Sequence, residues 1–262
     1  MALYGILGDI HGNREALASA LTRLEDARVD RILCVGDIVG YNADPEECVA
    51  MLREREAICI AGNHDRIGVG TLGFERCSNK AMHSLKRTRR ALTLGTAQWL
   101  RALPSHRILE DRFLLTHGGV RDIQQYMTRP RHFLENAAYL ERDFPGIRLC
   151  FFGHTHEQRV FEIEAGEACE LDAGNVALRP GRTYFVNPGS VDASRKRAHK
   201  FAELALFDSH SMTVRFARTP YDERSTEERA REHGYRIDHW RDRLYDVQRR
   251  VVGPRHVESG TH

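Results

Sequence analysis

Hydrophobic and polar positions in the first 62 residues follow a pattern that predicts strand, helix, strand, helix, strand. Apolar runs at Leu3–Leu7, Arg31–Val35 and Ala57–Ala61 have the length and composition of buried strands. Between the first two, apolar residues from Leu17 to Leu24 recur at spacings of three and four, which predicts a helix that Asn13 can cap. Strands joined by helical crossovers pair in parallel, so this region predicts a parallel sheet.

The rest of the chain has a different pattern. Helical periodicity covers residues 76–102 and 131–142, and apolar strands are expected at Phe113–Thr116 and Arg148–Phe152. Short alternating strands with glycine-bearing turns extend from 159 to 218, which predicts an antiparallel or mixed sheet. The pattern as a whole therefore indicates an α/β fold.

The C-terminal segment from residue 221 is dense in charge and is expected to be helical. Its nine acidic residues equal its nine arginines, which is typical of a solvated helix. We therefore expect one domain over residues 1–220 and a charged helical extension over residues 221–262, packed on or beside it. These helices could also contact a second copy of the chain, so a homo-oligomer remains open.

Composition excludes several classes of protein. With 41% apolar residues the chain can bury a core, and its net charge of +2 gives no global field that would attract nucleic acid or membrane. No apolar run approaches the ~18 residues of a membrane span, and the N-terminus reads as a strand, not a signal peptide. Six cysteines without a CxxC pair do not suggest a disulfide framework. We therefore expect a cytoplasmic protein.

Residues that could bind metal follow five of the predicted strands. They are Asp9 with His11, Asp37, Asn63 with His64, His117, and His154 with His156. Because the carboxyl ends of neighbouring strands in an α/β sheet meet at one crevice, these side chains should converge. Carboxylate, imidazole and amide groups without thiolate suit Mn, Fe, Co, Ni or Zn.

Each of these residues also has a structural explanation when taken singly. Asp is a routine helix N-cap, and one His beside a strand is more often structural than a ligand. Their joint occurrence after successive strands favours a metal site. Seven candidate ligands exceed the four that one tetrahedral ion needs, and two ions ~3.5–4 Å apart serve phosphoryl transfer.

The candidate ligands stand in five motifs in a fixed order. They are Asp9-Ile10-His11, Gly36-Asp37-Ile38-Val39-Gly40, Gly62-Asn63-His64-Asp65, His117-Gly118 and Gly153-His154-Thr155-His156. With these motifs the chain resembles the calcineurin-like metallophosphoesterases, and the resemblance covers essentially the whole chain. It implies an α/β fold with two mixed β-sheets in a sandwich flanked by helices.

The resemblance also implies a role for each residue. Asp9, His11 and His156 would hold one metal ion, and Asn63, His117 and His154 a second, with Asp37 bridging them. His64 would stabilise the transition state or protonate the leaving oxygen, while a metal-bridging hydroxide attacks phosphorus in line. The two ions would be divalent or of mixed valence, with Mn or Fe favoured over Zn, Ni or Co.

Other segments of the chain resemble one branch of this family in particular. The blocks Gly40–Pro45, His117–Asp122 and Asn187–Val191, and the tail from Thr219, look like the YfcE-like bacterial and archaeal branch, which favours a phosphodiesterase. A phosphomonoesterase, or a hydrolase of nucleotides or diadenosine polyphosphates, is the alternative. Gly40 and Tyr41 replace the Asp and Arg of protein Ser/Thr phosphatases, which disfavours that activity.

The expected substrate is a small phosphorylated molecule or nucleotide. Arg121, close behind His117, is a candidate phosphate contact, although an Arg121–Asp122 surface pair is the alternative. The basic run Arg195–Lys200 could reach further phosphates or could be a solvated loop. Only the run Lys86–Arg90 supports a nuclease, and no aromatic residue interleaves with it to stack bases. An intact ligand set argues against a non-catalytic scaffold.

Overall fold

The computed structural model describes residues 2–193, 199–238, 240, 242–243 and 245. The helices are α1 (Arg14–Asp26), α2 (Pro45–Glu54), α3 (Asn63–Gly68), α4 (Asn79–Ala91), α5 (Leu94–Ala102), α6 (Pro130–Asp143) and α7 (Glu223–Glu232). The strands are β1 (Leu3–Leu7), β2 (Arg31–Cys34), β3 (Ile58–Cys59), β4 (His106–Leu109), β5 (Phe113–Thr116), β6 (Leu149–Phe151), β7 (Gln158–Glu164), β8 (Glu167–Leu171), β9 (Asn175–Ala177), β10 (Thr183–Pro188), β11 (Phe201–Asp208) and β12 (Thr213–Pro220).

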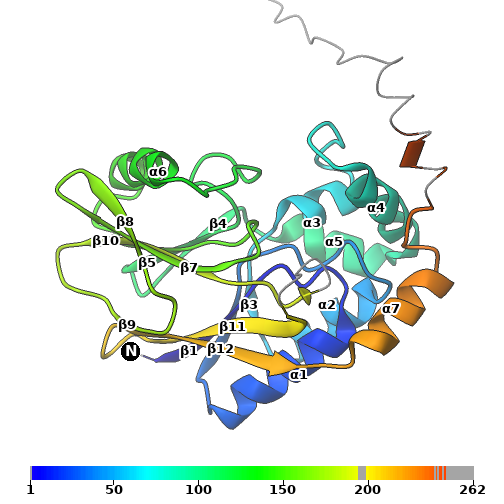
Figure 1. The fold of residues 1–262 in the computed structure, drawn as a ribbon, viewed down its shortest axis with the longest axis horizontal. Helices are drawn as coiled ribbons and strands as arrows, with labels where there is room; N and C mark the ends of the chain where they lie inside the picture. Colours follow the sequence, from blue (N-terminus) through cyan, green and yellow to red (C-terminus); the bar gives the residue numbers. More distant parts are fainter. Residues whose placement is uncertain (1, 194–198, 239, 241, 244, 246–262) are drawn as a thin grey trace, which may run out of the picture.

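The strands form two six-stranded sheets that face each other (Figure 1). The first has the order β3-β2-β1-β11-β12-β9, in which β1, β2 and β3 run parallel and β11 and β12 antiparallel. The second has the order β4-β5-β6-β10-β7-β8 and is also mixed. The predicted α/β fold, a sandwich of two mixed sheets flanked by helices, is therefore confirmed.

Alternation of side chains along the strands builds three apolar layers. Tyr4 and Ile6 of β1 point between the sheets, where they join Phe113, Phe151 and Phe207. The outer face of the first sheet packs against α1 and α2. The outer face of the second sheet is covered by α6, from which Phe133 stacks on Phe161 at a ring-centroid distance of 3.7 Å.

The region expected to be helical over residues 76–102 is two helices, α4 and α5. The break falls at Leu92 and Thr93, where Thr93 caps α5 by accepting a hydrogen bond from the backbone of Thr96 at 3.3 Å. A threonine hydroxyl satisfies an amide that a helix start leaves unpaired, so a new helix begins there. The short helix α3 and the mostly exposed strand β4 were not predicted either, because neither has an amphipathic repeat.

In the C-terminal extension, helix α7 lies against α1 and the start of α2. Arg229 of α7 forms ion pairs with Glu15 and with Asp44, the latter at 3.0 Å, and Thr226 contacts Asn13 at 3.1 Å. The domain boundary at residue 220 stays a prediction. Positions 195–198 of the basic run, and most of the chain beyond 238, lie outside the described residues. No helix among the described residues is long and apolar enough to span a bilayer.

Candidate metal centre

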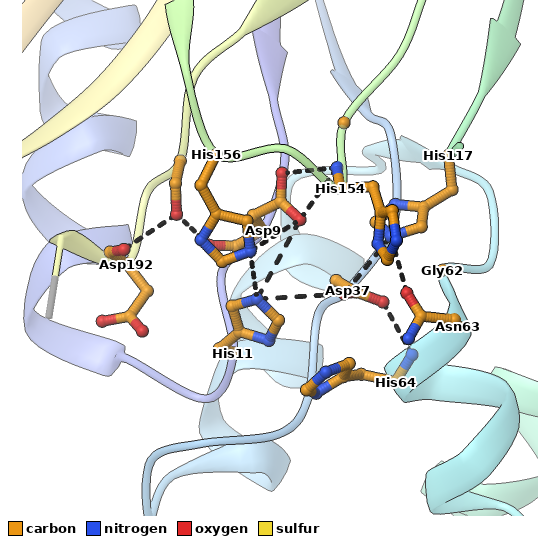
Figure 2. Close-up of polar contacts among 12 residues, drawn as sticks. Asp9, His11, Asp37, Gly62, Asn63, His64, His117, His154, His156 and Asp192 are labelled. Carbon is orange, nitrogen blue, oxygen red and sulfur yellow. Dashed lines mark hydrogen bonds and ion pairs between the residues drawn. The ribbon is translucent and has the colours of Figure 1, made fainter. Parts of the chain in front are cut away.

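The predicted site residues meet at the ends of strands from both sheets (Figure 2). Asp9 follows β1, Asp37 follows β2 and Asn63 begins α3 just after β3, whereas His117 follows β5 and His154 and His156 follow β6. We call Asp9, His11, Asp37, Asn63, His117, His154 and His156 the polar cluster. None of the seven residues is more than 9% exposed. The first sheet supplies both carboxylates and the amide, and the second supplies only imidazoles.

One half of the polar cluster consists of Asp9, His11 and His156. The Nε2 atoms of the two histidines are 3.1 Å apart, and Asp9 Oδ1 is 3.4 Å from His156 Nε2 and 3.9 Å from His11 Nε2. Atoms that bind one ion at about 2.1 Å lie roughly 3 to 4 Å from one another. These three side chains therefore have the spacing of ligands to a common cation.

The other half contains Asn63, His117 and His154. His117 Nε2 lies 3.1 Å from Asn63 Oδ1 and 3.2 Å from Asp37 Oδ2, and a ligand atom of His154 is within 4.8 Å of both His117 and Asp37. Asp37 Oδ2 is also 3.8 Å from His11 Nε2. Asp37 thus lies between the two halves, which is where a bridging carboxylate is required.

His154 provides a direct test of whether a metal ion fits. Its ring hydrogen-bonds to the backbone of Gln124, while its buried Nε2 has no hydrogen-bond partner among the described residues. Burial, reinforced by repulsion from His117, lowers the pKa of His154 to about 3, so the ring is neutral and Nε2 carries a lone pair. A buried polar atom without a partner costs about 1–3 kcal/mol, and a cation would remove that cost.

The electrostatics of the polar cluster also favour cations. Burial alone would raise the pKa of Asp37, but the neighbouring His117, His64 and His11 outweigh it and hold this pKa well below its usual range. Burial would lower the pKa of His117, yet the carboxylates of Asp37 and Asp9 raise it to about 9. The carboxylates of Asp37 and Asp9 thus place negative charge beside the histidines, and this charge would attract metal ions.

Five members of the polar cluster have a left-handed backbone. The φ angles are 52° at Asp9, 53° at His11, 55° at Asp37, 69° at His154 and 62° at His156. They make up five of the eleven non-glycine residues with positive φ in the described chain. This conformation is disfavoured for residues with a Cβ, and its concentration here is typical of a functional site.

Neighbouring groups hold the polar cluster in place. The Asp9 carboxylate accepts a hydrogen bond from the His154 backbone at 3.0 Å, and Ser190 Oγ donates to the Asp9 carbonyl at 2.9 Å. Asp65 accepts from three backbone amides, those of Ile38, Val39 and Gly62, at 2.8–3.1 Å. Sequence reasoning assigned no role to Ser190 or Asp65, although both stand in motifs that it quoted.

A pocket of about 360 Å³ opens beside the polar cluster. Asn63, His64 and His154 form the part next to the cluster. We call the remaining lining residues the pocket wall: Tyr41, Arg76, Cys77, Ser78, Ala81, Gln124 and Tyr126. Sequence reasoning did not identify Arg76 or Tyr126, because no motif marks either residue.

Arg121 does not belong to the pocket lining that the structure describes. It forms a bidentate ion pair with Asp143, with both bonds at 2.7 Å, and lies over the Tyr139 ring. The alternative pairing with Asp122 is wrong, since Asp122 pairs with Arg76 at 2.8 Å. The phosphate contact suggested for Arg121 stays a prediction.

The run Lys86–Arg90 is engaged within the fold. Lys86 and Arg89 lie over the Phe74 ring, and Arg89 donates to the Ile67 carbonyl. Thr88 is buried and bonds to the Gly40 carbonyl. Packing within the fold therefore explains the presence of Lys86, Thr88 and Arg89, and a bound nucleic acid is not needed to explain them.

Comparisons with known proteins identify the family and the fold. The model of the calcineurin-like phosphoesterase superfamily domain matches residues 2–212. An uncharacterised protein of Methanocaldococcus jannaschii is 27% identical over 226 residues, which cover 84% of this chain and 88% of that protein. A metallophosphoesterase from Sphaerobacter thermophilus has a TM-score of 0.72 at 28% identity, over 93% of this chain and 98% of that one. A hypothetical protein from Pyrococcus horikoshii OT3 shares the fold, with a TM-score of 0.70 at 18% identity over 93% and 97%.

Proposed function

Because the chain belongs to the calcineurin-like phosphoesterase superfamily, we propose that it is a phosphodiesterase whose polar cluster holds two metal ions. The observation that carries the proposal is the position of Asp37 Oδ2, 3.2 Å from His117 Nε2 in one half of the cluster and 3.8 Å from His11 Nε2 in the other. One ion would be held by Asp9, His11 and His156. The second would be held by Asn63, His117 and His154, and Asp37 would contact both ions. The donor set suits Mn, Fe, Co, Ni or Zn, and of these the resemblance to the family favours Mn or Fe.

Two ions bound there would supply hydroxide near neutral pH and neutralise charge on the phosphate oxygens. The protein's own contribution is orientation. His117 Nδ1 bonds to the Val35 carbonyl at 2.8 Å, which directs Nε2 into the cluster, and the backbone amide of His64 holds Asp37 Oδ1 at 2.8 Å. Such contacts fix ligand geometry before substrate arrives.

His64 is proposed to act on the leaving group. Its ring lines the pocket, only 5% exposed, and lies 4.6 Å from the His11 ring and 4.8 Å from the Tyr41 ring, measured between centroids. From this position it can donate a proton to the oxygen that leaves phosphorus or stabilise charge on it. The pocket beside it has room for an ester substituent, which supports hydrolysis of a small phosphate ester.

The first test is turnover of bis(p-nitrophenyl) phosphate and p-nitrophenyl phosphate by the Mn-loaded protein. The proposal expects diester cleavage that exceeds monoester cleavage and is lost in Asp37→Ala. Preference for the monoester would replace the phosphodiesterase with a phosphomonoesterase. Absence of both activities in a protein that binds two Mn ions per chain would contradict the enzymatic proposal.

A further inference from the structure

We propose that the pocket beside His64 is a subsite for a planar aromatic substituent of the substrate, such as a nucleobase, and that Tyr126 is its main contact. This inference rests on the proposed function, since it concerns the group attached to the reacting phosphate. The pocket shares Asn63, His64 and His154 with the candidate centre. A phosphate bound at the centre would therefore direct one of its substituents into the pocket.

Tyr126 has the features of a stacking platform. Its ring contacts the His154 ring, with centroids 4.1 Å apart and planes inclined at 45°. The side chain is nevertheless 51% exposed, which is high for a large aromatic residue beside a buried centre. Aromatic rings presented in this way bind bases of any sequence by stacking, because every base has a π-face.

The loop that carries Tyr126 is fixed across the pocket. Arg76, which precedes α4, donates to both carboxylate oxygens of Asp122 at 2.8 and 3.1 Å and to the Gln124 carbonyl at 2.7 Å. The last of these bonds is two residues from Tyr126. The backbone beside Tyr126 is thus held in position before a ligand arrives, which reduces the entropic cost of binding.

The residues that line the pocket indicate which kind of aromatic substituent it would bind. Tyr41 adds a second aromatic side chain, while Ser78 and Gln124 add groups that can hydrogen-bond to the edge of a heterocycle. The described lining residues include the cation Arg76 and no carboxylate. A volume of about 360 Å³ lies at the small end of ligand pockets, which suits one nucleoside and not a protein segment.

The test compares the binding of AMP and ribose 5-phosphate to the Mn-loaded protein by isothermal titration calorimetry. The two ligands share the phosphate and the sugar, so their affinity ratio isolates the base. We expect AMP to bind about 10-fold more tightly in the wild type, within the range that one stacked base contributes. Tyr126→Ala should bring the ratio to within about 2-fold, and Tyr126→Phe should preserve it.

Tyr139→Ala is the matched control, since it removes a tyrosine ring that lies on α6 under Arg121, and it should leave the ratio unchanged. Equal affinities in the wild type, or an unchanged ratio in Tyr126→Ala, would overturn the subsite while diester hydrolysis stands. If neither ligand binds and no ester is hydrolysed, the proposed function fails, and the subsite fails with it.

Discussion

The polar cluster and the pocket wall adjoin each other but are built differently. Members of the cluster follow strands of two sheets and are at most 9% exposed. Arg76 and Tyr126 in the wall lie on segments between secondary-structure elements and are about half exposed. Rigid strands fix atoms to the precision that metal coordination requires, whereas loops can change without disturbing the core. The difference suggests that the polar cluster determines which reaction occurs and that the pocket wall determines which substrate binds.

The largest expected effect comes from a substitution that alters no member of the cluster. A Cβ at Gly62 would lie 2.1 Å from Asp37 Oδ1 and 2.2 Å from the Asp37 backbone nitrogen, so Gly62→Ala must displace Asp37. We expect metal affinity to fall about 10- to 100-fold, as when groups that support metal ligands are changed. Metal titration and diester turnover measure the effect. Gly95→Ala in α5, where a Cβ meets nothing within 4 Å, is the control, and equal behaviour of the two variants would contradict the comparison.

Metal removal should affect the stability of the whole protein, because the cluster joins the two sheets. At a metal concentration 100 times Kd, binding stabilises a fold by about 2.7 kcal/mol, which raises Tm by roughly 5–10 °C for a chain of this size. Differential scanning fluorimetry with and without a chelator measures this shift. Tyr126→Ala should retain it and Asp37→Asn should lose most of it. A chelator-independent Tm in the metal-loaded wild type would count against a bridging site.

A smaller effect is expected at the pocket wall. Arg76→Ala releases the segment that carries Tyr126. It should raise KM for a nucleotide diester about 3- to 5-fold and change kcat by less than about 2-fold, because an exposed ion pair contributes little free energy. Arg55→Ala breaks a comparable arginine–carboxylate pair, the one with Glu25 at 3.0 Å outside the pocket lining, and should change neither constant. Steady-state kinetics measure both variants. Equal effects of the two substitutions would show that Arg76 has no specific role in the pocket.

The smallest effect is expected from the C-terminal extension. Arg236 donates to the Tyr41 carbonyl and to Asn42 Oδ1, both at 2.9 Å, and so supports one side of the pocket. Arg236→Ala should raise KM about 2-fold and lower Tm by about 2–4 °C, as expected for a loss of about 1 kcal/mol. Arg224→Ala, which breaks an exposed pair within α7, should do neither. Identical melting curves for the two variants would show that the extension does not support the wall.

The sequence predicted the cluster well because its residues are tied to strands. A buried strand has a recognisable apolar run, and parallel strands end at a shared edge, so Asp9, Asp37 and His154 could be placed together before their distances were known. Tyr126 and Arg76 are tied to no such pattern. Their position depends on how two connecting segments fold over the strand ends, and the ion pair that joins the segments links residues 46 positions apart. The break at Thr93 was missed for a different reason, because helical periodicity extends across it.

The left-handed backbone at five cluster positions has a consequence for how this protein can evolve. A glycine at any of them would relax the backbone, because it lacks the Cβ that makes the conformation unfavourable. Selection for stability alone would therefore favour glycine at these five positions, so the proposed activity, and not stability, would explain why their side chains are kept. A descendant released from catalysis should lose these residues early and gain robustness to mutation as it does so.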